Sequence, residues 1–421
     1  MSVAFLDLND CNLQLWHGAT RIQSPGYALL NGQRYLFGNA ARTAARVQPR
    51  NINTRFWWQL STEALTPALG PARHTGDLAH AHLQDIYQQA SKPDEWVFAV
   101  SGSMQRDQLS LLLGIAQQCP FSAVGLINRS VVLASQHQRG ADLWHLEIQL
   151  HQSLLSRLER TGDTVQLRQD IALPGCGLLQ LQERIVQHIS QAFVKQTRFD
   201  PRRKAETEQA LFDALPKALV DLRSHSEANI EVAGYRARIL GAELEQAGSK
   251  LFDSAASAID AHPGPLLADA LAGLLPGLKS AFREVQVVAP DAISSALRNH
   301  GETVIQRENN LHYITALPCL LDSSEEAAVN TTPTAHASPA ASVPEPTHLL
   351  QGAEARPLSA AGTVLIDGWE VYRGAAGWQL RGNKDAATVN GRPQSVATAL
   401  QSGDRIDVGG GSDFTLIRVA E

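Results

Sequence analysis

The sequence is poor in features that mark several functional classes. Its four cysteines, Cys11, Cys119, Cys176 and Cys319, lie far apart and form no Cys-x-x-Cys pair, so we expect reduced thiols rather than a disulfide framework or a zinc site. It also has no basic excess, since the formal net charge is -6. This balance argues against nucleic acid or an anionic membrane surface as a partner.

Long apolar runs are absent as well. No uninterrupted apolar segment approaches the ~20 residues needed to cross a bilayer, and the chain opens directly into an expected strand rather than into a signal peptide. These two observations predict a cytoplasmic protein that does not insert into a membrane.

What the sequence does contain predicts a multidomain globular protein. It has 421 residues, 44% of them hydrophobic and 19% charged, which is enough for two or three domains with apolar cores. We expect an α/β body over residues 1–321 and a small all-β domain over residues 347–421. Residues 322–346 are rich in Ala, Ser, Thr, Pro and Glu without apolar periodicity, so we expect a flexible linker there.

Residues 3–18, VAFLDLNDCNLQLWHG, predict two short strands joined by a polar turn. The run before Asp7 is continuously apolar, which is typical of a strand buried on both faces, and the run after Asn12 alternates with a period of two. This opening resembles that of the actin and DnaK-type heat-shock ATPases, in which the hairpin wraps the phosphates of a nucleotide. The resemblance makes Asp7, Asn9 and Asn12 candidate cofactor-binding side chains, and Asp10 adds a second carboxylate.

The rest of the body repeats this arrangement. Residues 3–38 predict three strands, and residues 143–171 predict three more, with a hairpin turn at Thr161-Gly162-Asp163. A last strand is expected at residues 285–288. The helices expected in the second half cover residues 178–193, 205–224 and 235–260. The body therefore predicts a duplicated α/β architecture.

Several segments, in this order, carry a family resemblance. They are FGNAARTAARVQPRNINTRFWW at residues 37–58, WVFAVSGSM through FSAVGLINRSVVLA at 96–134, and RFDPRRKAETEQALFDALPKAL with ANIEVAGYRARILGAELEQAGSKLF within 198–252. Residues 1–321 resemble the nucleotide-binding domain of the DnaK-type heat-shock chaperones, within the actin-like ATPase superfamily. The resemblance implies a duplicated two-lobed fold.

The same resemblance implies three nucleotide-binding loops, whose glycines let main-chain N–H groups reach phosphate oxygens while carboxylates hold magnesium through water. Asp7 stands where the family has its first-strand aspartate, but Asn9-Asp10-Cys11 replaces the family's Gly-Thr-Thr/Ser. Glu147 could replace the second aspartate, yet residues 147–152, EIQLHQ, contain no glycine. The carboxylate of Asp10 would also face a phosphate, which is unfavourable without a metal.

Other positions of the family pattern are lost too. The family's glutamate of the Asn-Glu-Pro motif aligns with Arg129, and no lysine occurs near Trp58-Gln59. Residues 289–292, APDA, stand where the third loop should read Gly-Gly-x-Ser/Thr, and a proline has no N–H to donate. Residues 212–217, FDALPK, lack the charged side chains that clamp the base. We therefore expect no cofactor and no metal.

Residues 347–421 resemble a forkhead-associated domain, a β-sandwich that reads phosphothreonine. The segment from GWQLRG to FTLIRV follows the closing pattern of that family and includes Thr-x-Val-Asn-Gly, so Asn390 is a candidate phosphopeptide residue. The family's Gly-Arg position falls at residues 366–368, which contain no arginine, and its Ser-x-x-His position falls at residues 369–373, which contain no serine. Asp367 would instead repel a phosphate.

These observations favour a non-catalytic pseudo-ATPase that acts as a scaffold or adaptor through protein–protein contacts. Two alternatives stay open. The first is a divergent, chaperone-like ATPase that uses ATP and magnesium with Asp7, Asp10 and Glu147 as catalytic residues. The second is a phosphothreonine-peptide reader that works through the C-terminal domain.

Overall fold

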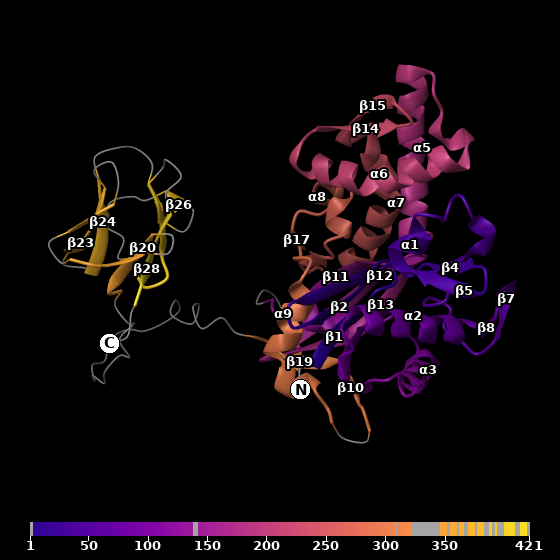
Figure 1. Ribbon diagram of the computed structural model, residues 1–421, viewed down its shortest axis with the longest axis horizontal. Helices are drawn as coiled ribbons and strands as arrows, with labels where there is room; N and C mark the ends of the chain where they lie inside the picture. Colours follow the sequence, from indigo (N-terminus) through magenta and orange to yellow (C-terminus); the bar gives the residue numbers. More distant parts are fainter. Residues whose placement is uncertain are drawn as a thin grey trace. The chain divides into compact units, whose positions relative to one another are not determined.

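The computed structural model describes residues 3–137, 142–307 and 310–320, and, near the C-terminus, residues 346–351, 354–359, 362–365, 369–374, 377–382, 387–389, 392–393, 400–408 and 413–418. The chain forms two compact units, residues 1–325 and 326–421, and each is described by itself (Figure 1). The expected linker falls almost entirely outside the described residues. The boundaries 1–321, 322–346 and 347–421 therefore stay predictions.

The first sheet of the larger unit has the strand order β18-β10-β9-β1-β2-β3. Strands β1, β2 and β3 form an antiparallel meander. Strands β9, β10 and β18 lie on the other side of β1 and run parallel to it. The strands are β1 (Val3–Leu8), β2 (Leu13–His17), β3 (Thr20–Ser24), β9 (Glu95–Val100), β10 (Ser122–Asn128) and β18 (Tyr313–Ile314). Because β1 lies inside the sheet and is covered on both faces, its apolar run is continuous.

The second sheet has the order β17-β16-β11-β12-β13-β19. Its strands are β11 (Asp142–Ile148), β12 (Gln152–Thr161), β13 (Thr164–Pro174), β16 (Leu266–Ala268), β17 (Val285–Val287) and β19 (Ala316–Pro318). Again three strands form an antiparallel meander and two more run parallel to the first of them. Five strands of each sheet thus repeat one order, whereas the sixth, β18 or β19, joins at opposite ends, and the body is a mixed α/β structure. We call the parts built on the two sheets the first and second lobes.

Ten helices occur among the described residues. They are α1 (Gly38–Arg42), α2 (Thr75–Gln89), α3 (Arg106–Ala116), α4 (Arg129–Ala134), α5 (Leu178–Thr197), α6 (Ala205–Ser224), α7 (Gly241–Asp260), α8 (Leu278–Ala281), α9 (Ala292–Asn299) and α10 (Gly301–Val304). The helix predicted over residues 178–193 is confirmed as α5, on which Leu181, Ile185, Ile189 and Phe193 are all buried. No described helix has the length and hydropathy of a membrane span.

One predicted helix was wrong at its start. Residues 235–240 form β15 (Tyr235–Leu240), which pairs with β14 (Glu227–Val232), and only α7 is helical. The apolar residues Ala237 and Ile239 are two apart and both buried, which is a strand period. The turn before them has positive φ at Ala233 and Gly234. Figure 1 shows β14 and β15 grouped with α5, α6 and α7 at one end of the larger unit.

Short strands complete the first lobe. They are β4 (Ala28–Asn31), β5 (Arg34–Phe37), β6 (Ile52–Asn53), β7 (Ala64–Leu69) and β8 (Ala72–His74), which form a three-stranded and a two-stranded sheet.

A shared apolar core joins the two lobes. Each lobe has its own buried cluster, and a third cluster combines Phe5 and Trp16 of the first sheet with Leu143 and Leu158 of the second, together with Val131 of α4. Because this third cluster draws on both sheets, the lobes are packed against each other beneath the site described next.

All described elements of the smaller unit are strands. They are β20 (His348–Gln351), β21 (Glu354–Pro357), β22 (Thr363–Val364), β23 (Glu370–Gly374), β24 (Gly377–Arg381), β25 (Thr388–Val389), β26 (Arg392–Pro393), β27 (Arg405–Asp407) and β28 (Asp413–Ile417). They form a six-stranded and a three-stranded sheet. Leu349 and Phe414 of the first pack with Val371 and Trp378 of the second in one buried cluster, as in a sandwich.

Candidate functional site

A buried arginine occupies the place where the two lobes meet. Arg129 is the first residue of α4, directly after β10 ends at Asn128. The Asn128 side chain caps this helix by accepting hydrogen bonds from the main-chain N–H groups of Ser130 and Val131. This cap fixes the start of α4 at the carboxyl end of a parallel strand, the edge of an α/β sheet where polar side chains gather.

Three carboxylates from both lobes surround this guanidinium. Arg129 Nε and Nη2 donate to the two oxygens of Asp7 at 2.9 and 3.2 Å, and Nη1 and Nη2 donate to those of Asp269 at 2.9 and 3.3 Å. Glu147 Oε2 lies 2.9 Å from Nη1. Asp7 is the next-to-last residue of β1, Glu147 lies in β11 and Asp269 follows β16. We call these four residues the Arg129 cluster.

Every side chain of the Arg129 cluster is withdrawn from solvent, with exposures of 4% for Arg129, 3% for Asp7, 0% for Glu147 and 9% for Asp269. Burial raises the pKa of Asp7 against the opposing effect of Arg129. Burial acts the same way on Asp269, but there the guanidinium and the hydrogen bond with His145 outweigh it and lower the pKa. Burial disfavours the charged guanidinium, yet the three carboxylates hold the pKa of Arg129 well above its usual value.

A second layer of polar side chains supports Asp269. His145 Nε2 lies 3.1 Å from Asp269 Oδ1, and its Nδ1 lies 2.8 Å from Ser130 Oγ. Ser130 Oγ in turn donates to Ser156 Oγ at 3.1 Å. This chain of contacts orients the carboxylate toward Arg129 and keeps the buried polar atoms satisfied.

The two loops nearest the cluster bond to each other. The Asn9 side chain donates to the carbonyl of Ile148 at 3.0 Å, and the main-chain N–H of Leu150 donates to Asp10 Oδ1 at 2.8 Å. Gln149 Nε2 donates to Ser103 Oγ at 2.8 Å. The polar groups of the β1–β2 and β11–β12 turns are therefore directed at one another rather than into an open space.

Asp10 is the least compensated acid of this region. Its Oδ2 is buried and has no hydrogen-bond partner within the part of the chain that the structure describes. Burial raises the pKa of Asp10 to about 7, with a further contribution from the nearby Glu147 and an opposing one from the hydrogen bond with Leu150. Near neutral pH this side chain is therefore partly protonated.

The structure brings most of the predicted site residues together. Asp7, Asn9, Asp10 and Glu147 all lie at the junction of the lobes, as the bonds above show. Asn12 does not join them: it is partly buried in the same turn, and it lines a separate cavity. Asn390 lies outside the described residues.

The position assigned to the third loop was wrong. Residues 289–292 follow β17, which is the edge strand of the second sheet, whereas β16 is the strand that pairs with β11. It is therefore the residue after β16, Asp269, that reaches the Arg129 cluster. The sequence analysis missed Asp269 because β16 is only three residues long. The sequence signal that could have found Asp269 was its position directly after the apolar residues Leu266–Ala268.

The carboxylates do not form a metal site in this arrangement. Within the described residues, no group of three or more His, Cys, Asp or Glu side chains is placed to hold a metal ion. The point on which Asp7, Glu147 and Asp269 converge is occupied by Arg129, whose guanidinium supplies the positive charge there.

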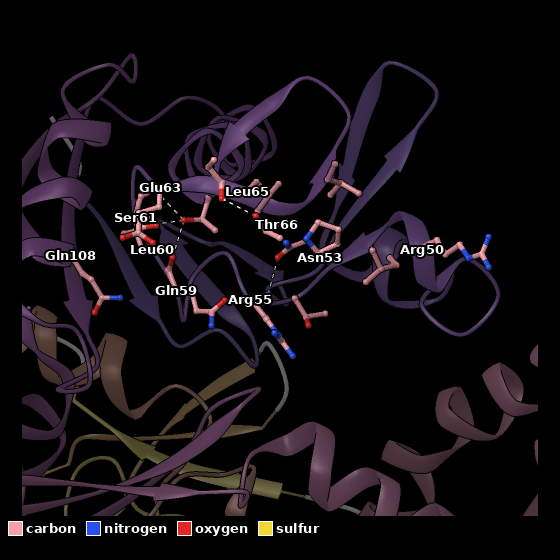
Figure 2. A pocket seen from close by; sticks show the side chains of 16 residues that line it. Arg50, Asn53, Arg55, Gln59, Leu60, Ser61, Glu63, Leu65, Thr66 and Gln108 are labelled. Carbon is pink, nitrogen blue, oxygen red and sulfur yellow. Dashed lines mark hydrogen bonds between the residues drawn. The ribbon is translucent and has the colours of Figure 1, made fainter.

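A separate hollow of about 740 Å³ lies on the first lobe (Figure 2). Its lining is mostly polar and includes Arg50, Arg55 and Glu63. Figure 2 shows the two arginine side chains pointing in different directions. Their charges do not converge on one anion, so this hollow does not resemble a phosphate site.

No protein-family model matches the chain, and no curated protein matches it. The geometry of the site is therefore the basis on which function is argued.

Replacing Arg129 by Met should lower the free energy of unfolding by about 3–5 kcal/mol, because it leaves buried carboxylates without their cation. Denaturant unfolding would measure the loss. The matched control is Arg307→Met, which removes an exposed arginine bonded through two nitrogens to Glu95 and should cost far less, because solvent screens an exposed ion pair. Equal losses in the two variants would contradict the role given to Arg129.

Replacing Asp10 by Asn should stabilise the protein at pH 8 by about 2–4 kcal/mol and change its pH dependence. The folded state binds a proton at Asp10 more tightly than the unfolded state does. Wild-type stability from this group is therefore greatest below pH 3.8 and declines until pH reaches about 7. The asparagine oxygen can still accept the Leu150 hydrogen bond.

Unfolding measured between pH 4 and pH 8 tests this prediction. The difference in free energy of unfolding between wild type and Asp10→Asn should grow with pH over that range. The control is Asp253→Asn, at an exposed position of α7, whose free energy of unfolding should differ from that of wild type by the same small amount throughout. A constant difference for Asp10→Asn would count against a raised pKa at Asp10.

Proposed function

We propose that this protein is a non-catalytic pseudo-ATPase: a DnaK- and actin-like body that no longer uses ATP and acts as a scaffold or adaptor through protein–protein interaction. The observation that carries the proposal is the Arg129 cluster. A guanidinium, rather than a metal ion bound to a nucleotide, neutralises the acids at the junction of the lobes.

The energetics of this junction oppose nucleotide entry. A magnesium ion could approach Asp7 and Glu147 only if Arg129 left them, and breaking a buried ion pair costs about 3–5 kcal/mol. A triphosphate between the turns would also have to break the bonds from Asn9 to Ile148 and from Leu150 to Asp10. Each lost hydrogen bond adds roughly 1 kcal/mol.

A divergent ATPase is the alternative that these contacts disfavour most. It would use Asp7, Asp10 and Glu147 around magnesium, but Asp7 and Glu147 contact Arg129 and Asp10 faces Leu150. The other alternative, phosphothreonine reading, depends on Asn390 and its surroundings, and no contact among the described residues favours it.

The distribution of exposed apolar side chains supports an interaction role. Among the described residues, eight large hydrophobic side chains are clearly exposed, and four of them, Val194, Val220, Tyr235 and Leu240, come from α5, α6 and β15. These elements group at one end of the larger unit (Figure 1). Exposed apolar side chains on neighbouring elements are a common feature of protein-binding surfaces. We place the partner contact at this end.

Millimolar ATP with magnesium should leave the melting temperature of the full chain unchanged. A real site filled at 100 times its Kd would add about 2.7 kcal/mol of stability, which a thermal-shift scan detects readily. A DnaK-type nucleotide-binding domain in the same assay is the positive control. A concentration-dependent stabilisation that Asp7→Asn abolishes would overturn the pseudo-ATPase proposal.

The scaffold role predicts a partner that co-purifies with the full chain in a fixed ratio. Tyr235→Asp, at a side chain 45% exposed, should reduce the recovered partner roughly tenfold or more, because exposed tyrosines are frequent interface hot spots. Val47→Asp is the control, since Val47 is similarly exposed at 43% but lies in the first lobe. Equal loss in both variants, or no partner at all, would contradict the assigned surface.

A further inference from the structure

An apolar cavity of about 290 Å³ lies beside the β1–β2 and β11–β12 turns of the larger unit. Nine of its seventeen lining residues are leucine or isoleucine, among them Leu181 and Ile185 of α5 and Leu215 and Leu219 of α6. Cys11 and Asn12 of the β1–β2 turn line it from the first lobe. Both lobes therefore contribute to its wall.

The polar lining of this cavity is almost entirely neutral. Its amide side chains are those of Asn12, Gln23, Asn39 and Gln182. The one cationic side chain, Arg42, already contacts Asn39 Oδ1 at 3.3 Å and Asp213 Oδ1 at 3.4 Å. No carboxylate lines the cavity. The wall thus offers hydrogen-bonding groups and apolar surface without an unpaired charge that would attract an anion.

The size of the cavity limits what it can hold. It has the volume of about ten water molecules at ~30 Å³ each, and it is at the small end of the range for small-molecule sites. Water has few polar partners against the leucine and isoleucine side chains, and apolar cavities of this kind take up apolar molecules.

We propose that this cavity binds a neutral, predominantly apolar small molecule of up to three rings, held between the two lobes. The leucine and isoleucine side chains of α5 and α6 cover its apolar body. The amides of Asn12, Asn39 and Gln182 are available for a polar substituent. The site is independent of ATP binding, so it goes beyond the pseudo-ATPase proposal and does not rest on it.

Two dyes with the same ring skeleton test the proposal. N-phenyl-1-naphthylamine is neutral, and 8-anilinonaphthalene-1-sulfonate carries a sulfonate on the same rings. Fluorescence titration of the full chain should give saturable, one-to-one binding of the neutral dye, at least tenfold tighter than that of the anionic dye. Non-saturable binding, or tighter binding of the sulfonate, would overturn the proposal.

Filling the cavity should remove the binding. Leu274→Trp adds volume from a partly buried lining position and should weaken binding of the neutral dye at least tenfold. Val47→Trp, at a side chain 43% exposed and outside the cavity lining, should leave it unchanged. If Leu274→Trp does not fold, as judged by circular dichroism, Leu178→Trp replaces it, since Leu178 also lines the cavity and is partly buried.

Three further outcomes relate this proposal to the preceding one. Dye binding that is the same in the filled variant and the wild type would overturn the cavity assignment and leave the pseudo-ATPase proposal standing. Dye binding that is unaffected by millimolar ATP and magnesium supports both. Displacement of the dye by ATP would overturn the assignment of a neutral ligand and would contradict the loss of nucleotide binding as well.

Discussion

The ion pairs of Arg129 with Asp7, Glu147 and Asp269 are the interaction on which the centre of the larger unit depends. A guanidinium is always charged and offers five N–H donors in a fixed plane, so it can serve several carboxylates at once. Asp7 and Asp269 each receive two hydrogen bonds from it. Without this cation, the acids at the ends of the two sheets would repel one another in a region that water does not reach.

The closed turns are a second consequence of the same chemistry. With Arg129 in place, the side chains of Asn9 and Asp10 bond to the main chain of the opposite turn at Ile148 and Leu150. Glycines would leave main-chain N–H groups open to a ligand. The side chains present here use those N–H groups and carbonyls internally. The apolar cavity next to these turns is a space between the lobes whose lining suits a neutral ligand.

Much of this arrangement could be predicted from the sequence. The continuous apolar run before Asp7 and the hairpin signals predicted two copies of a three-strand unit, and the strand orders of both sheets agree with that repeat. The grouping of Asp7, Asp10 and Glu147 was implied by the resemblance to the nucleotide loops of the ATPase family, and the structure places these three side chains near one another. Whether the chain belongs to the actin-like superfamily stays a prediction.

Other features could not be predicted. The start of α7 was placed too early because Tyr235–Leu240 contains residues compatible with helix, and its pairing with β14 is a tertiary effect. Asp269 went unnoticed because the strand before it is short. Arg129 was noted only because it stands where the resembled family has a glutamate. The sequence does not show that the Arg129 guanidinium supplies the positive charge beside Asp7 and Asp269. That contact depends on the folded distance between segments more than a hundred residues apart in the chain.

The division of the cluster between the lobes has a consequence for folding. Arg129 and Asp7 belong to the first lobe, and Glu147 and Asp269 belong to the second. A second lobe folded alone would bury two acids without a cation, and the shared apolar cluster of Phe5 and Leu143 would be open on one side. The second lobe therefore depends on the first for the cation of its buried acids, and each lobe depends on the other to cover the shared apolar cluster.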